Sequence, residues 1–221
     1  MKKIFVWGAR KSGTSYMESL FRVNFDNPIA DLYHPDSEEF KKHGSKYDLD
    51  QHISDKFDPD DIHICVVRNP MSWIVSRKKH EDFKNKNDAS HISKDMAMCF
   101  TKEYNEFYKT MSHIKMDAFV TYESLLSNLV WVLSTIDKSC PDLIKMAGNW
   151  YDKTVLIMPG GRSPMRVQHQ RPTDAARMYH DELGVDGMNW ITKNIDHDVL
   201  NFYGYHNNGI WIDKREGLNA L

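Results

Sequence analysis

Three short apolar runs, each followed by a helical pattern, constrain the fold of this chain more than any other feature. The runs cover residues 4–7, 62–67 and 117–122 and have the length and composition of buried strands. Helical periodicity follows at 14–23, from residue 72 onward and at 125–133. A strand followed by a helix, three times over, predicts an α/β fold in three layers, with a mostly parallel central sheet flanked by helices.

The rest of the chain adds helices but no second folding unit. A long helix is predicted after Ser93, a residue type that favours the N-cap position. Apolar side chains then recur at spacings of three and four and predict one buried stripe, made of Met96, Phe100, Tyr104, Phe107 and Met111. Two shorter helical patterns lie between 174 and 203. The 221 residues contain no repeat and no linker, so we expect a single domain over 1–221.

The charge balance and the cysteines exclude several classes of protein. The formal net charge is −2, so the chain lacks the overall positive field of a nucleic-acid binder. Cys65, Cys99 and Cys140 are widely separated, which is typical of reduced thiols. The apolar run at the start is too short for a signal peptide or a membrane span. We therefore expect a cytoplasmic protein with no nucleic-acid partner and no membrane span.

The loop between the first run and its helix reads G8-A-R-K-S-G-T-S15. A glycine-containing turn followed by a helix N-terminus forms a cradle for anions, because backbone N–H groups and the helix dipole point the same way. In a P-loop that binds a nucleoside triphosphate, a lysine follows the second glycine, whereas Thr14 stands there in this chain. Arg10 and Lys11 offer cations from inside the loop instead. This pattern favours a phosphate-like ligand over a magnesium-bound triphosphate.

Two motifs carry a resemblance to the sulfotransferase family. R10-K-S-G-T-S15 resembles the loop with which these enzymes hold the 5'-phosphosulfate of 3'-phosphoadenosine 5'-phosphosulfate (PAPS), and V66-V-R-N-P-M-S-W-I-V-S76 resembles their second signature. The resemblance implies a P-loop NTPase-like fold and transfer of a sulfuryl group from PAPS to an acceptor, with 3',5'-adenosine bisphosphate (PAP) as product and no metal. The implied acceptor is a hydroxyl or amine on a small molecule or glycan. Neither its identity nor the oligomeric state is specified by the sequence.

The same resemblance implies roles for individual residues. Lys11 would neutralise the charge that builds on the leaving phosphate, and the rest of the loop would hold the 5'-phosphate through Arg10, Ser12, Gly13, Thr14 and Ser15. Arg68 and Ser76 would bind the 3'-phosphate. The alternatives without a ligand are a surface salt bridge for Arg68 and a serine in the first turns of a helix for Ser76. V120-T-Y-E-S-L125 is similar to a family segment whose tyrosine lies near the adenine, which points to Tyr122.

The proton acceptor is expected between the two phosphate motifs, where the family uses a histidine or, in some branches, a glutamate. His43 is favoured because K41-K-H-G44 places a near-neutral base among cations and beside a glycine. His34 is the second candidate. His63 is expected to be a satisfied strand residue and His52 a surface residue, and Glu38 and Glu39 also lie in this interval.

Further basic residues are weaker candidates. The run R77-K-K-H80 is expected to be a solvated helix face. Arg162, Arg166 and Arg171 lie where sulfotransferases often carry a loop that closes over the nucleotide, and Arg162 and Arg166 are counted among the nucleotide-binding candidates. The family's Arg-Lys-Gly motif does not occur in its usual context, so the arginine that closes the site stays open.

Two other classes of function are compatible with the same loops. One is a kinase with an atypical loop, which would use ATP with magnesium and an acidic residue to hold the metal. The other is a non-catalytic nucleotide-binding module. Donor preference separates the kinase from the sulfotransferase, and turnover separates both enzymes from the module.

Overall fold

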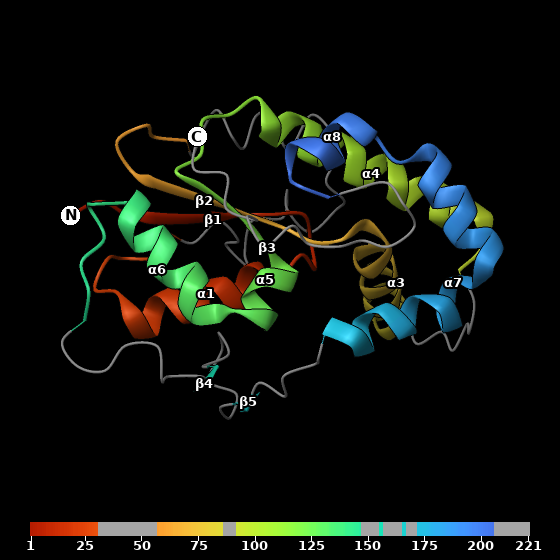
Figure 1. Ribbon diagram of the computed structural model, residues 1–221, viewed down its shortest axis with the longest axis horizontal. Helices are drawn as coiled ribbons and strands as arrows, with labels where there is room; N and C mark the ends of the chain where they lie inside the picture. The colour runs from red at the N-terminus through yellow and green to blue at the C-terminus, as the bar shows by residue number, and fades with distance from the viewer. Residues whose placement is uncertain (31–56, 86–91, 147–154, 157–164, 167–171, 206–221) are drawn as a thin grey trace.

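A parallel sheet of three strands forms the centre of the computed structural model (Figure 1), which describes residues 1–30, 57–85, 92–146, 155–156, 165–166 and 172–205. The strands are β1 (Ile4–Trp7), β2 (Ile62–Val67) and β3 (Ala118–Thr121), in the order β1-β2-β3. Ile4 pairs with Ile62, and Ile64 pairs with Ala118. The three expected strands and their parallel pairing are confirmed.

Helices cover both faces of this sheet, because successive residues of a strand point to opposite sides. Phe5, Trp7 and Phe119 belong to one hydrophobic core, which α3 (Pro70–Asn85), α4 (Lys94–Ser112), α7 (Pro172–Asn194) and α8 (His197–Phe202) complete. Val6 and Val120 belong to the other core, which α1 (Thr14–Asn24), α5 (Tyr122–Ser127) and α6 (Leu129–Ser139) complete. In Figure 1, α4 and α8 lie on one side of the strands and α1, α5 and α6 on the other. The α/β architecture with helices on both faces is confirmed.

A short segment beside β1 determines where the strand order reverses. Ile29 forms a parallel bridge with Ile4, supported by hydrogen bonds from the Ile4 N–H to the Pro28 carbonyl (2.9 Å) and from the Ala30 N–H to the Ile4 carbonyl (2.8 Å). The chain therefore passes from β1 to this segment on one side and later to β2 on the other side. In open α/β sheets, ligands bind at the carboxyl ends of the strands at such a reversal. Loop 8–13 follows β1 at this point.

The helices differ from the expected ones in three details. The pattern at 125–133 belongs to two helices, α5 and α6, which meet at Asn128, and α5 begins at Tyr122 because Thr121 Oγ1 accepts a hydrogen bond from the Ser124 N–H (3.3 Å). In α4, the expected stripe included Phe107, but Phe107 is only partly buried and its neighbour Tyr108 is fully buried. The Tyr108 hydroxyl donates to the Val66 carbonyl (3.0 Å). α7 is interrupted at Gly184, which has non-helical backbone angles.

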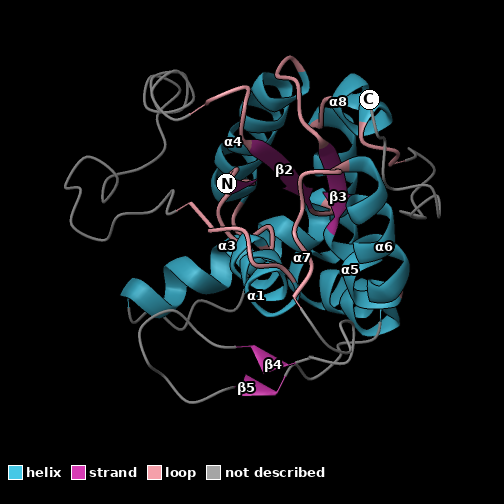
Figure 2. Cartoon of the chain, turned by 90° about the vertical axis from the view of Figure 1, so that its left-hand side faces the viewer, coloured by secondary structure: helices cyan, strands magenta, loops and turns pink. Residues whose placement is uncertain are grey.

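Two further elements lie away from the sheet. β4 (Val155–Leu156) and β5 (Met165–Arg166) pair with each other in an antiparallel manner. β4 lies next to α1, and Figure 2 shows the pair apart from the three-stranded sheet. Within the described ranges, no helix has the length and apolar character needed to cross a membrane.

Candidate functional site

The carboxyl ends of the three parallel strands bring most of the described candidates to one edge of the sheet. Loop 8–13 follows β1, Arg68 follows β2, and Tyr122 follows β3. The strands are neighbours, so residues more than fifty positions apart in sequence meet there. Contacts of the Arg68 guanidinium with Lys11 and Tyr122 join all three strand ends.

The loop itself has a tightly wound backbone. Lys11 adopts a left-handed conformation (φ 72°), as does Gly13 (φ 107°), and the Ser12 N–H donates to the Ala9 carbonyl (2.9 Å). A Cβ atom at Gly13 would overlap the ring of Tyr122. A left-handed lysine is uncommon and unfavourable, and residues in such conformations cluster at functional sites.

Side chains from the neighbouring strand and helix hold two carbonyls of the loop. Trp73 Nε1 donates to the Arg10 carbonyl (2.7 Å), and Arg68 Nη1 donates to the Lys11 carbonyl (3.1 Å). Trp73 is fully buried in α3, so this contact joins the loop to the core. These bonds fix the orientation of the peptide groups in the loop.

The N-terminus of α1 presents donors that have no acceptor among the described residues. Gly13 is the N-cap and supplies no side-chain hydrogen bond, and the first turn contains no acidic residue. The first paired N–H groups are those of Tyr16 and Met17, which both donate to the Gly13 carbonyl (3.1 Å). The N–H groups of Thr14 and Ser15 therefore lie at the positive end of the helix dipole and are available to an anion.

The loop side chains differ in exposure. Arg10, Lys11 and Ser15 are exposed, whereas Thr14 and Ser12 are buried. Among the described residues, Ser12 Oγ has no hydrogen-bond partner of good geometry, although it lies close enough to the Tyr108 hydroxyl to oppose the effect of burial on the pKa of that tyrosine. Such a hydroxyl is an unusual feature of the loop, because most buried polar groups have a hydrogen-bond partner.

Arg68 is held by three contacts of its side chain. Nε donates to Ser72 Oγ (2.7 Å), Nη1 donates to the Lys11 carbonyl, and the guanidinium carbon lies 4.6 Å from the centre of the Tyr122 ring. The guanidinium is therefore preorganised beside loop 8–13. Helix α3 begins at Pro70, directly after Arg68 and Asn69, because proline is favoured at the first helical position. Asn69 Oδ1 caps the helix by accepting hydrogen bonds from the N–H groups of Met71 (3.0 Å) and Ser72 (3.3 Å).

Three residues at this edge were not singled out in the sequence. Ser72, and not Ser76, is the α3 serine that bonds Arg68, and Ser76 lies one helical turn further along. Trp73 and Glu123 also contribute, the latter with a partly buried carboxylate. The two motifs at 66–76 and 120–125 contain all three residues. Trp73 and Glu123 contact residues more than fifty positions away, so only the structure reveals their roles. Ser72 lies four positions after Arg68, so helical spacing in the sequence could have indicated this contact.

Other candidates lie elsewhere or outside the described residues. His34, His43, His52, Arg162 and Arg171 lie outside them. Arg166 is in β5, where only the backbone is described. Among the residues that the structure describes, no group of three or more His, Cys, Asp or Glu side chains could hold a metal ion.

The expectation of a solvated basic face at R77-K-K-H80 is wrong for Arg77 and Lys78, which are both buried. α3 packs between α4 and α7, and Arg77 pairs with Glu103 of α4 (3.4 Å) over the ring of Phe100. Lys79 pairs with Glu182 of α7 (3.0 Å). These charges join helices, since long basic side chains bury their stems and pair their heads.

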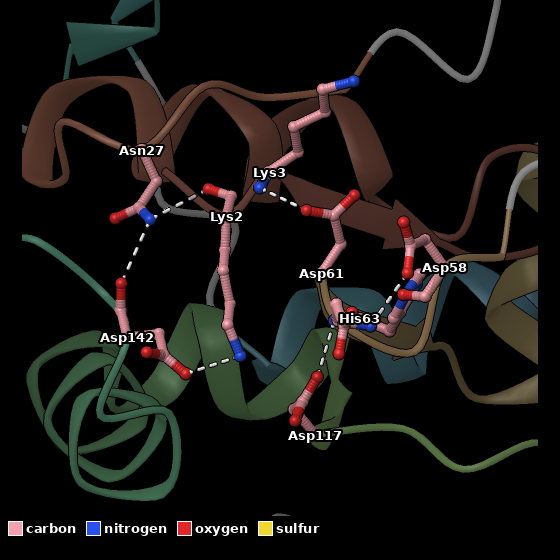
Figure 3. Close-up of polar contacts among 9 residues, drawn as sticks. Lys2, Lys3, Asn27, Asp58, Asp61, His63, Asp117 and Asp142 are labelled. Atoms are coloured by element: carbon pink, nitrogen blue, oxygen red, sulfur yellow. Dashed lines mark hydrogen bonds and ion pairs between the residues drawn. The ribbon is translucent and has the colours of Figure 1, made fainter.

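His63 is a satisfied strand residue, as expected. Its side chain is 2% exposed, Nδ1 accepts from Trp7 Nε1 (2.9 Å), and Nε2 donates to the Asp58 carbonyl (2.7 Å). Figure 3 shows this contact with Asp58 and the bond from the His63 N–H to Asp117 (2.7 Å). Burial lowers the pKa of His63, against the opposing effects of the Asp58 carbonyl and nearby carboxylates. The neutral ring therefore contributes to the core and not to the candidate site.

Acidification is expected to destabilise the fold through His63. Its pKa is lower in the folded state than the ordinary value of about 6.5, so the unfolded state binds the extra proton and stability falls as the pH drops below that value. The loss from one proton is at most about 1.4 kcal/mol per pH unit. Urea unfolding at pH 5 and pH 7.5 measures it.

His63→Gln should lack this part of the pH dependence, whereas exposed His113→Gln should retain it. An unchanged pH dependence in His63→Gln would contradict the assignment.

The chain was compared with protein-family models and with curated proteins. No protein-family model matches the chain, and no curated protein matches it either. The chemistry of the site therefore rests on its own residues, which bring exposed cationic side chains and the N–H groups at the start of α1 to one edge of the sheet.

Proposed function

We propose that this chain is a sulfotransferase that moves a sulfuryl group from PAPS to an acceptor hydroxyl or amine. The observation that carries the proposal is the contact between the two motifs: Arg68 lies directly against the Lys11 carbonyl, beside the open N-terminus of α1. A ligand with two separate phosphate groups matches this arrangement, because one group can occupy the cradle while the other meets the guanidinium.

The placement of the site supports a P-loop NTPase-like fold for the chain. The cradle follows β1, and β1 lies between the Ile29 segment and β2, where the strand order reverses. Loop, helix N-terminus and strand reversal coincide, as they do in nucleotide-binding α/β folds generally. We infer that a single domain over 1–221 carries this site.

Each residue of the cradle has a task in the proposed reaction. The acceptor oxygen attacks the sulfur atom, the bond from sulfur to the bridging oxygen of the 5'-phosphate breaks, and PAP leaves. Lys11 neutralises the negative charge that develops on that oxygen, and the N–H groups of Thr14 and Ser15 hold the 5'-phosphate. The acceptor proton passes to a general base, for which His43 is the first candidate and His34 the second.

Arg68 gives the site its preference among nucleotides. A 3'-phosphate is a dianion that ADP and ATP lack, and a guanidinium binds phosphate through two parallel hydrogen bonds. Ser72 holds Nε, and Ser76 lies on the same side of α3 one turn later. Tyr122 stacks on the guanidinium and borders the space in which the adenosine would lie.

Incubation with PAPS and a panel of sugars, phenols and amines tests the proposal. We expect PAP and a sulfated acceptor in equal amounts, at a rate that EDTA leaves unchanged. His43→Ala and His34→Ala then identify the base by which of them loses turnover. Consumption of ATP that depends on magnesium would instead establish the kinase, and PAP binding without any turnover of PAPS would establish the binding module.

A further inference from the structure

The peptide group that links Arg68 to Asn69 is held at both of its polar ends. Its carbonyl accepts a hydrogen bond from the Tyr104 hydroxyl (2.8 Å), and its N–H donates to Glu123 Oε1 (3.1 Å). Glu123 thus fixes the backbone from which the Arg68 side chain extends. A residue that acts in this way is a positioning residue.

The second oxygen of Glu123 has a different kind of partner. Oε2 accepts from the Tyr205 hydroxyl (2.6 Å), which comes from the chain after α8. A backbone N–H can only donate, so Oε1 must remain an acceptor, whereas a tyrosine hydroxyl can either donate or accept. A proton added to Oε2 would therefore keep both contacts, with the bond to Tyr205 reversed.

Several charged and titratable groups surround Glu123, and burial and its neighbours act on its proton in opposite directions. The Arg68 guanidinium is the cation that acts on Glu123. Tyr104 and Tyr108 of α4 stay neutral at ordinary pH, because burial raises the pKa of each well above its usual range. Burial also raises the pKa of Glu123, while the Tyr205 hydroxyl and Arg68 oppose this effect. Arg68 therefore stabilises the negative charge of the Glu123 carboxylate, and this stabilisation weakens when the guanidinium pairs with another anion.

We propose that Glu123 couples binding of the phosphate dianion at Arg68 to uptake of one proton on Glu123 Oε2. The proposal rests on the proposed function, because it takes the 3'-phosphate as the anion. When that anion arrives, it pairs with the guanidinium and brings a second negative charge beside Glu123. The proton comes from solvent, and it removes the repulsion between carboxylate and phosphate.

Glu123→Gln provides a matched test. Glutamine keeps an acceptor for the Asn69 N–H and offers a donor to Tyr205, so it mimics protonated Glu123 at both contacts. The PAP affinities of Glu123→Gln and wild type are measured by calorimetric titration from pH 5.5 to pH 8. Protonation of the phosphates of PAP affects both proteins equally, so it cancels in the ratio of the two affinities. We expect Glu123→Gln to bind about tenfold more tightly at pH 8 and equally well at pH 5.5.

Two further results complete the test. Titrations in buffers of different ionisation enthalpy should show greater proton uptake by wild type than by Glu123→Gln. Tyr205→Phe keeps the Glu123 carboxylate but removes the hydroxyl that donates to its ionised form, which raises the pKa of Glu123. The affinity ratio of Glu123→Gln to Tyr205→Phe should therefore change at a higher pH than the ratio of Glu123→Gln to wild type. If Glu123 had only a structural role, the ratio of the PAP affinities of Glu123→Gln and wild type would not vary with pH.

The outcomes separate the two proposals. If wild type binds PAP and the affinity ratio stays constant across the pH range, the proton coupling is overturned while the proposed function survives. If neither folded protein binds PAP, the anion site fails and the coupling fails with it.

Discussion

Arg68→Ala is expected to weaken PAP binding by about 10²- to 10⁴-fold. The substitution removes the guanidinium that would pair with the 3'-phosphate, and charge-assisted hydrogen bonds each contribute about 1.5–3 kcal/mol. It also removes the bonds to the Lys11 carbonyl and Ser72 Oγ, so loop 8–13 loses one of its supports. Calorimetric titration with PAP, beside the free energy of unfolding, separates loss of the ligand contact from loss of the fold.

Two control variants make the result specific. Arg68→Lys keeps the charge but not the planar pair of donors, so its affinity should lie between those of wild type and Arg68→Ala. Arg22→Ala removes the same charge from the exposed last turn of α1 and should bind PAP within about twofold of wild type. Equal losses in Arg22→Ala and Arg68→Ala would mean that net charge, and not a site, governs binding.

Lys11→Gly is expected to lower sulfuryl transfer by about 10²- to 10³-fold, the usual loss when one preorganised electrostatic donor is removed. PAP binding should weaken less than turnover, because in the proposed mechanism the amine acts mainly on charge that develops during bond breaking. Release of PAP from PAPS, with and without acceptor, measures turnover.

Lys11→Ala is the matched variant, because it removes the same amine but keeps a side chain at a left-handed backbone position. Both variants should lose turnover equally, while Lys11→Gly should be more stable than Lys11→Ala by about 1 kcal/mol. If only Lys11→Ala lost turnover, the shape of the loop and not its amine would carry the chemistry. Full turnover in both would remove Lys11 from the mechanism.

The sequence predicted the three strands of the parallel sheet and most of the helices, but not β4 or β5, because the signals that it used are local. Apolar runs such as 62–67 and the N-cap at Ser93 depend on neighbours only a few positions away. The loop at 8–13 was found for the same reason. Arg68 was singled out through the family resemblance, and its place beside the loop is a finding of the structure, in which the carboxyl ends of parallel strands share one edge.

The contacts that orient the site could not be predicted in the same way. Trp73 meets the Arg10 carbonyl and Tyr205 meets Glu123 across 63 and 82 positions of sequence, so no local pattern encodes them. The burial of Arg77 and Lys78 was missed because a run of basic residues does not show which helices will cover it. His34 and His43 remain predictions.

Calorimetric titration with PAP, ADP and ATP, with and without magnesium, tests the central claim most directly. If loop 8–13 and Arg68 form the proposed site, PAP binds without magnesium and at least about 100-fold more tightly than ADP, since ADP lacks the 3'-phosphate. Tighter binding of ATP, dependent on magnesium, would contradict the assignment of Arg68 to a 3'-phosphate and would favour the kinase.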